Sequence, residues 1–384
     1  MTGHTCLLAS AAAPGRGTGR LAAILLSGAL LLAGLPAFAG PSVAQARTPV
    51  LAYYYIWFTR DSWSRAKRDL PALGPYSSDD ANIMRQHIRW AKAAGINGFL
   101  VSWKNTPALT RRLQTLIGVA DDEQFQLSII YEGLDFTRRP LAVDQIAADF
   151  DVFLNHFAAD PAFRMFAKPL VVWSGTWEFA PEDVARVTSS RREQLLILGS
   201  ERSAEAYQRL AGLVDGDAYY WSSVDPDVDR NFRQKLSGMG QAVHDHGGLW
   251  IAPAAPGFDA RLLGGTRTVE RKDGDTLRRE LDAAAASAPD AIGLISWNEF
   301  SENSYVEPSR NLGTRYLDVL TQLLGGAPSV SPAPGVPALA IDTSTAPTIN
   351  TSTPSASDVS PAPNIDTPPI DSPPPGDDAG SAPS

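Results

Sequence analysis

Residues 81–103 read ANIMRQHIRWAKAAGINGFLVSW. Ala81–Ala94 has the pattern of a helix that Ser78-Asp79-Asp80 can cap, and Gly95 stands where a C-terminal glycine is expected. The run Gly98–Trp103 is almost entirely apolar, which is typical of a strand covered on both faces. A helix that leads directly into a buried strand is the repeating unit of an α/β fold.

This unit recurs through the middle of the chain. Eight apolar, β-branched or aromatic runs are each followed by a polar, helix-patterned stretch: Val50–Trp57, Gly98–Trp103, Gln126–Glu132, Pro169–Trp173, Leu195–Ser200, Asp217–Trp221, Gly248–Pro253 and Ile292–Trp297. The expected helices include Ala81–Ala94, Asp144–Phe157, Ala204–Leu213, Phe232–Asp245 and Leu277–Ser287. The pattern favours a single (β/α)8 TIM barrel over residues 47–326 rather than a doubly wound sheet. No nucleotide-binding G-x-G-x-x-G or G-x-x-x-x-G-K motif follows any of these runs.

Residues 1–46 have the features of a secretory signal peptide. Arg16 and Arg20 precede the apolar run Leu21–Phe38, and A-x-A cleavage sites lie at 37–39 and 44–46. We therefore expect a protein that is secreted or held in the periplasm or cell envelope, with no membrane contact after cleavage. The alternative is an uncleaved membrane anchor, because the apolar run is long for a signal.

The other end of the chain is distinct in composition. Residues 327–384 contain 14 of the 30 prolines and six aspartates but no Lys, Arg or Glu, so we predict a disordered Pro/Ser/Thr/Asp-rich tail. Without these aspartates and the two arginines of the signal, the formal net charge of −9 becomes −5 for residues 47–326. Such a mildly acidic body has no electrostatic footprint for nucleic acid, so uncharged partners fit better. The single cysteine, Cys6, lies in the signal, and stability must come from a large core.

The ends of the predicted strands are rich in aromatic and carboxylate side chains. Active sites of barrels of this class lie at these carboxyl ends. Aromatic faces stack on sugar rings while carboxylates and amides bind hydroxyl groups, so the pattern predicts a carbohydrate cleft. The substrate contacts that we predict are Tyr55, Trp57, Trp103, Glu132, Trp221, Phe258, Trp297 and Asn298.

Two further carboxylates, Glu299 and Glu302, follow the last strand in the sequence ISWNEFSEN, residues 295–303. Side chains three residues apart share a side if the chain turns helically. Hydrolysis of a sugar bond by acid–base chemistry needs two carboxyl groups in different protonation states. Two groups on one turn are poorly placed to flank a bond from opposite sides, so we predict that they approach neighbouring atoms of one sugar, such as the C2 hydroxyl and the glycosidic oxygen. For a lone Glu, a helix cap or a solvated loop charge is the alternative.

Other chemistries have less support. His244-Asp245-His246 precedes the seventh strand, which places it at the opposite end of the barrel from the predicted cleft. No G-x-S-x-G motif is present, which argues against a Ser-His-Asp hydrolase. We expect neither a metal ion nor a cofactor.

These residues resemble glycoside hydrolase family 99, the endo-α-mannosidases, and the related family 71-like barrels. The resemblance extends over nearly all of residues 50–318. Its motifs are Tyr54-Tyr55-Ile56-Trp57, Gly74-Pro75-Tyr76, residues 93–103, Tyr131-Glu132, Pro256-Gly257-Phe258-Asp259 and residues 296–302. The last motif resembles the Asn-Glu-Trp-His-Glu of the family and is the most specific.

The resemblance implies a (β/α)8 barrel that cleaves with retention of the anomeric configuration. It implies that Glu302 is the general acid/base, that Glu299 deprotonates the 2-hydroxyl to give a 1,2-anhydro sugar, that Glu132 binds substrate and that Trp103 contacts the sugar. The chain departs from the family pattern in ways that bear on the sugar recognised: Ser301-Glu302-Asn303 replaces His-Glu-Gly, Phe258 replaces a Tyr, Trp103-Lys104 replaces Trp-Trp, and Trp173-Ser174-Gly175 stands where a Tyr-Asp pair is expected.

The sequence thus predicts an exported, monomeric, retaining glycoside hydrolase that cleaves α-linked mannan- or glucan-like polysaccharide or oligosaccharide. One alternative is a hydrolase of a different cell-envelope glycan. The others are a non-catalytic carbohydrate-binding barrel and a structural wall protein that works through its tail.

Overall fold

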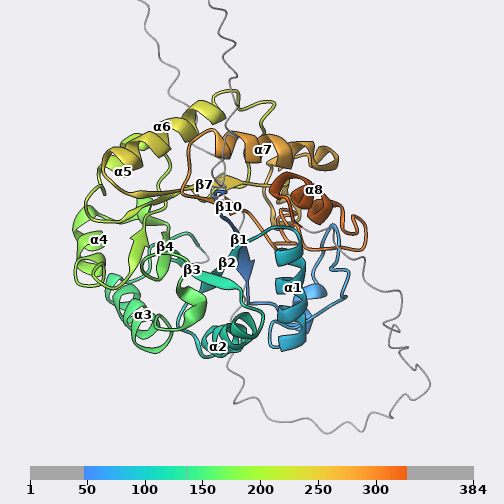
Figure 1. Cartoon of the computed structure of the whole chain (residues 1–384), viewed down its shortest axis with the longest axis horizontal. Coiled ribbons are helices and arrows are strands. Elements are labelled where there is room, and N and C mark those ends of the chain that lie inside the picture. The colour runs from blue at the N-terminus through green and yellow to red at the C-terminus, as the bar shows by residue number, and fades with distance from the viewer. Residues whose placement is uncertain (1–46, 136, 327–384) are drawn as a thin grey trace, which may run out of the picture. The chain divides into compact units, whose positions relative to one another are not determined.

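Eight parallel strands form a barrel ringed by helices (Figure 1). The computed structural model describes residues 47–135 and 137–326; the predicted signal and tail lie outside them. The strands are β1 Val50–Tyr55, β2 Gly98–Trp103, β3 Gln126–Glu132, β4 Leu170–Ser174, β5 Leu196–Leu198, β6 Gly216–Ala218, β7 Leu249–Ala254 and β10 Ala291–Leu294. Their order is β5-β4-β3-β2-β1-β10-β7-β6, and a parallel bridge between Gly199 and Asp217 joins the two outer strands. The predicted (β/α)8 architecture is confirmed.

Strands β5 and β6 are shorter than the sequence predicts. Beyond Gly199, side chains take the place of the strand ladder. The Ser200 amide donates to Thr176 Oγ1 at 2.9 Å, and the Glu201 amide donates to Asp217 Oδ1 at 2.8 Å. These bonds satisfy buried backbone donors without continuing the sheet.

The helices are α1 Ala81–Ala93, α2 Pro107–Asp122, α3 Val143–His156, α4 Pro181–Thr188, α5 Ala204–Gln208, α6 Phe232–Asp245, α7 Asp275–Ala285 and α8 Arg315–Leu324. As predicted, α1 is capped by Asp80, whose side chain accepts from the Asn82 amide, and Gly95 follows it at φ +87°. Helix α5 ends at Gln208 and is shorter than predicted, and Gly212, at φ +84°, lies in the turn that follows. No helix in the described part of the chain is long and apolar enough to cross a membrane.

A two-stranded antiparallel pair, β8 Phe258–Asp259 and β9 Thr268–Val269, lies between β7 and α7 in the sequence. The sequence did not predict it, since strands of two residues carry no periodic pattern. Its importance is positional, because the Asp259 amide donates to the carbonyl oxygen of Glu302 at 2.7 Å.

The core has an inner and an outer layer. Successive strand residues point to opposite faces, so Tyr53 and Tyr55 lie inside the barrel, whereas Tyr54 and Ile56 pack against the helices. The same alternation applies to every strand that ends at the mouth. It therefore decides which aromatic side chains reach the barrel opening.

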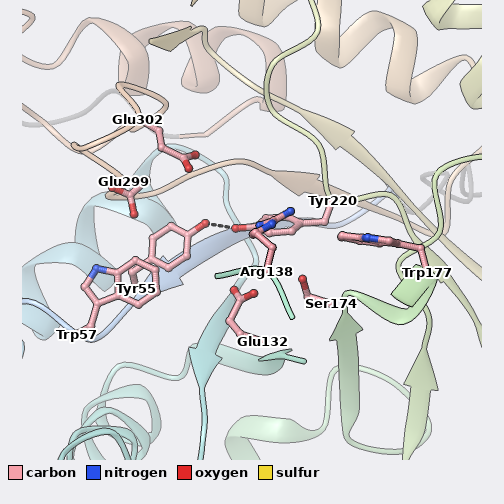
Figure 2. Close-up of a pocket in the computed structure, with 9 residues that line it drawn as sticks. All are labelled: Tyr55, Trp57, Glu132, Arg138, Ser174, Trp177, Tyr220, Glu299 and Glu302. Atoms are coloured by element: carbon pink, nitrogen blue, oxygen red, sulfur yellow. Dashed lines mark hydrogen bonds between the residues drawn. The ribbon is translucent and has the colours of Figure 1, made fainter. Parts of the chain in front are cut away.

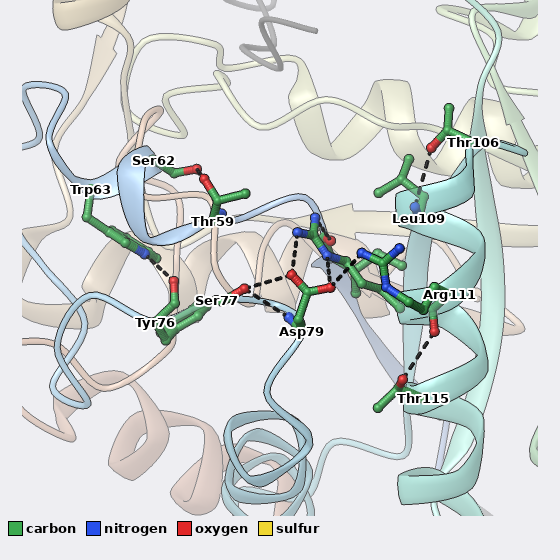
Figure 3. A network of polar contacts seen from close by, with 12 residues as sticks. Thr59, Ser62, Trp63, Tyr76, Ser77, Asp79, Thr106, Leu109, Arg111 and Thr115 are labelled. Carbon is green, nitrogen blue, oxygen red and sulfur yellow. Dashed lines mark hydrogen bonds and ion pairs between the residues drawn. The ribbon is translucent and has the colours of Figure 1, made fainter. Parts of the chain in front are cut away.

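The segment that follows β1 is fixed by a buried arginine of α2. Arg112 Nη1 donates to the Ile56 carbonyl oxygen at 3.1 Å, while its Nε and Nη2 bind the Asp79 carboxylate at 3.0 and 2.7 Å. These bonds to Arg112 are the main reason that the pKa of Asp79 lies well below its usual range. Nearby, Trp63 Nε1 donates to the Tyr76 carbonyl oxygen at 2.7 Å (Figure 3). The backbone just before Trp57 is thus held in place.

Candidate active site

A pocket opens at the carboxyl ends of the strands (Figure 2). Five of the side chains predicted from sequence line it: Tyr55, Trp57, Glu132, Glu299 and Glu302. Four more complete the lining, namely Arg138, Ser174, Trp177 and Tyr220. Figure 2 shows Glu299 and Glu302 on one side and Glu132 on the other, with Trp57 and Trp177 at opposite ends.

The turn that carries Glu299 and Glu302 is held by hydrogen bonds just before it and within it. Before it, the Trp297 amide donates to the Tyr53 carbonyl oxygen at 2.8 Å. Within it, the Glu299 amide donates to Ser296 Oγ at 2.8 Å and the Ser304 amide to the Glu299 carbonyl oxygen at 3.2 Å. The two glutamates are only 3% and 4% exposed, so their carboxylates face the pocket rather than solvent.

Two opposing effects act on the pKa of Glu299. Burial raises the pKa of Glu299, while the Ser301 amide, which donates to Oε1 at 2.9 Å, and the charge of Lys67 oppose the rise. Lys67 Nζ donates to Ser301 Oγ at 3.2 Å. A buried carboxyl with an elevated pKa is suited to take up a proton near neutral pH.

Glu132 is set up in a similar way at the end of β3. Burial raises its pKa, and the charges of Lys104 and Arg138 with the hydroxyls of Ser174 and Ser102 oppose the rise. Lys104 Nζ donates to the Leu134 carbonyl oxygen at 2.9 Å, which holds this cation beside β3.

Aromatic side chains form the floor of the pocket. The Tyr55 and Tyr220 hydroxyls are hydrogen-bonded to each other, and the Tyr55 ring stacks on Trp57 with centroids 4.3 Å apart. Burial, with neighbouring charges next, raises the pKa of both tyrosines well above the ordinary value. Both hydroxyls are therefore neutral at physiological pH and offer hydrogen bonds to a ligand. Among the described residues, no group of three or more His, Cys, Asp or Glu side chains is placed to hold a metal ion.

Comparison with known proteins decides the family. The sequence model of glycosyl hydrolase family 99 matches residues 64–322. This chain belongs to glycosyl hydrolase family 99.

Curated proteins with endo-mannosidase names are also similar to this chain. Glycoprotein endo-alpha-1,2-mannosidase of Rattus norvegicus is 21% identical over 277 residues, which cover 65% of this chain and 59% of the rat protein. A glycoprotein endo-alpha-1,2-mannosidase-like protein of Danio rerio is 23% identical over 291 residues, covering 65% and 61%. The chain therefore spans about three fifths of the length of these relatives.

Solved structures show the same fold. Two structures of the GH99 endo-alpha-mannosidase from Bacteroides thetaiotaomicron superpose with TM-scores of 0.64 and 0.63 at 18% and 20% identity. They cover 73% of this chain and 97% and 96% of theirs. The barrel of family 99 is thus present almost in full.

Three tryptophans of this family 99 barrel do not line the pocket, which corrects the prediction of sugar contacts. Trp103, Trp221 and Trp297 are buried in the outer layer, between strands and helices. Trp103 packs near Phe153 with centroids 6.1 Å apart. The cause is strand alternation: at the ends of β2 and β6, Ser102 and Tyr220 point inward and their tryptophan neighbours point outward.

Asn298 and Phe258 are also corrected. Asn298 is fully buried; its Oδ1 accepts from the Tyr55 amide at 2.9 Å, and its Nδ2 donates to the Tyr55 carbonyl oxygen at 3.0 Å and to the Tyr76 hydroxyl at 3.2 Å. Both amide hydrogens are thereby used, so Asn298 positions Tyr55 instead of binding sugar. Phe258 is buried in a small cluster with Ala260 and Val269.

Some pocket residues escaped the prediction. Ser174 ends β4 and Tyr220 follows β6, both on the inward face, and alternation from Val172 and Ala218 would have found them. Arg138 lies in the loop after β3, and no sequence pattern places it at the mouth. The same is true of Lys67, which acts on Glu299 without lining the pocket.

Replacing Asn298 tests its positioning role. Asn298→Ala leaves the Tyr55 amide and carbonyl buried without partners, so we expect a loss of about 2–4 kcal/mol in the free energy of unfolding. Urea unfolding measures this, with Asn82→Ala on the exposed side of α1 as the control, expected within about 0.5 kcal/mol of wild type. Equal stability of the two variants would contradict the role.

Proposed function

We propose that this family 99 member is an exported, retaining glycoside hydrolase that cleaves α-linked mannan- or glucan-like polysaccharide with Glu299 and Glu302. The observation that carries the proposal is the placement of both carboxylates on one turn that faces a pocket with an aromatic floor. Family membership and the endo-mannosidase relatives support a glycan substrate.

The proposed first step uses both carboxyl groups on one sugar of a mannan-like substrate, in which O2 is trans to the glycosidic oxygen and can attack C1 from the opposite face. Glu299 takes the proton from the 2-hydroxyl as O2 attacks C1, and the bond from C1 to the leaving oxygen breaks as Glu302 gives that oxygen its proton. The product is a 1,2-anhydro sugar. A pair on one turn suits this step, because O2 and the glycosidic oxygen are on adjacent carbons. A nucleophilic carboxylate would instead have to reach C1 from the face opposite the acid.

The second step reverses the proton transfers. Glu302, now ionised, takes a proton from water as the water oxygen attacks C1; the bond between C1 and O2 breaks, and Glu299 returns its proton to O2. Two inversions at C1 give net retention. In this scheme Glu132, across the pocket, binds sugar hydroxyls, and Trp57 and Trp177 stack on sugar rings at the two ends.

Glu302→Gln tests the catalytic assignment. The amide keeps the shape but cannot donate the proton, so we expect kcat to fall by about 10²–10⁴-fold while oligosaccharide binding persists. The measurement is turnover of α-mannan, α-glucan and cell-envelope glycans with product anomers read by NMR, and Glu182→Gln, an exposed site on α4, is the control. If wild type and Glu302→Gln are equally inert on this panel, the hydrolase proposal fails and a carbohydrate-binding barrel takes its place.

The pKa of Glu299 predicts the pH dependence. Because burial raises its pKa and the base must be ionised, the acidic limb of kcat/KM should lie above the ordinary glutamate value of about 4.3. Lys67→Gln removes an opposing positive charge, so the limb should move to higher pH, and Lys67→Arg should largely restore it. An unchanged limb in Lys67→Gln would show that this charge does not act on the base.

Export and the tail make a separate prediction. If residues 1–46 are a cleaved signal, N-terminal sequencing of the secreted protein should begin after residue 39 or 46, whereas an anchored protein would keep its N-terminus. Deleting residues 327–384 should leave turnover of a soluble oligosaccharide unchanged. Loss of turnover on that deletion would favour a protein that works through its tail.

A further inference from the structure

One end of the pocket carries positive charge that the proposed chemistry does not use. Arg138 lines the pocket between its two acidic sides (Figure 2). Beyond Trp177, the guanidinium of Arg202 lies 4.3 Å from the Trp177 ring centroid and 5.4 Å from that of Trp221. We call Arg138, Trp177 and Arg202 the cationic end of the pocket.

Arg202 is partly buried, and the charges of Glu178 and Glu201 offset its own charge in part. It is wedged between two indole rings, and its Nε is buried without a hydrogen-bond partner among residues 47–135 and 137–326. After burial, the charge of Arg138 is the next cause that lowers the pKa of Arg202, so the two guanidinium groups are near enough to repel each other.

Several other arginines of the barrel form ion pairs with carboxylates. Arg191 binds Asp151 at 2.6 Å, and Arg209 binds Glu201 at 2.9 Å. Neither Arg138 nor Arg202 forms an ion pair with any residue in the described part of the chain. Two neighbouring cations without such partners are unfavourable in the ligand-free protein, which makes them candidates for binding an anion.

Neutralising Glu132 is the simplest alternative role for Arg138. Yet Lys104 opposes the raised pKa of Glu132 more strongly than Arg138 does. Arg202 does not line the pocket, and its guanidinium packs over the Trp177 ring. Compensation of Glu132 therefore does not account for Arg202, whose pKa stays lowered by burial and by Arg138 although Glu178 and Glu201 oppose this.

We propose that the cationic end is a subsite for a sugar that bears an anionic substituent, a carboxylate, sulfate or phosphate ester. Trp177 stacks on the ring, Arg138 donates hydrogen bonds to the anion, and Arg202 adds positive charge from behind the indole. The inference rests on the proposed function, because it assigns a substrate class to the same pocket. It implies that the natural glycan is acidic, or is modified by acidic groups, where it passes Trp177.

Binding to the inactive Glu302→Gln protein tests the subsite apart from catalysis. The probes are an α-linked mannobioside and its analogues with a 6-carboxylate, 6-sulfate or 6-phosphate on the non-reducing sugar, titrated by NMR. At low salt, at least one anionic analogue should bind about tenfold or more tightly than the neutral disaccharide, and the advantage should shrink as ionic strength rises. The three analogues show which anion is taken.

Variants made in the Glu302→Gln protein assign the effect to residues. Arg138→Gln should bring the anionic-to-neutral affinity ratio close to one, and Arg202→Gln should lower it in part. Arg186→Gln, on the exposed side of α4, should keep the full ratio. The second arginine variant keeps the test decisive if Arg138→Gln does not fold.

Several results would overturn the subsite. They are equal binding of neutral and anionic probes, no binding of either, or an anionic preference that survives both arginine variants. The two proposals fail separately. If the wild type hydrolyses neutral glycans and shows no anionic preference, the hydrolase proposal stands and the subsite proposal fails. If the protein binds anionic sugars selectively but hydrolyses no glycan, the subsite proposal stands and the hydrolase proposal fails.

Discussion

The hydrogen bonds between the Asn298 amide and the Tyr55 backbone hold the pocket together. The ladder between β1 and β10 ends at Ala52 and Leu294, well before either chain segment reaches the pocket. Beyond that point the Trp297 amide bonded to the Tyr53 carbonyl, and then the Asn298 side chain bonded to both backbone groups of Tyr55, replace the missing rungs. The aromatic floor and the carboxylate turn therefore keep a fixed relation although their strands have ended.

A buried polar chain extends this constraint to helix α1. The Tyr76 hydroxyl, a partner of Asn298, donates to Glu307 Oε2 at 2.9 Å. Glu307 Oε1 lies 3.2 Å from Nε2 of His87, whose Nδ1 is 3.1 Å from the Tyr54 hydroxyl. Burying a carboxylate is costly unless such partners surround it, and a network whose members depend on one another resists small displacements. The turn that bears Glu299 is thereby tied to the helical ring as well as to the sheet.

The sequence predicted the barrel well because each strand is buried on both faces and so reads as an apolar run. The same property hid which face is inward. Trp103 and Ser102 are neighbours in one such run. Trp103 was predicted to contact sugar because of its aromatic ring, but in the structure the Ser102 side chain points inward and Trp103 points outward. The predicted length of β5 was wrong for another reason, because side-chain acceptors replace the backbone hydrogen bonds at its end. Arg138 lay beyond prediction, because only the folded loop after β3 brings it to the mouth.

The pocket has carboxylates and a cation at different places along its lining. Each acidic residue that burial makes harder to ionise has a lysine acting on it: Lys67 on Glu299, and Lys104 on Glu132. Those lysines also bind a hydroxyl or a carbonyl of the scaffold, so they tune the carboxylates without occupying the space for a ligand. Arg138 differs, because it lines the pocket itself. Arg138 opposes the raised pKa of Glu132, as Lys104 does. Unlike Lys104, it can also contact a ligand, and an acidic sugar would be repelled by the carboxylates unless such a cation offset them. The division of charge thus favours one orientation of the glycan, with its neutral linkage at the carboxylate turn and its anion at Trp177.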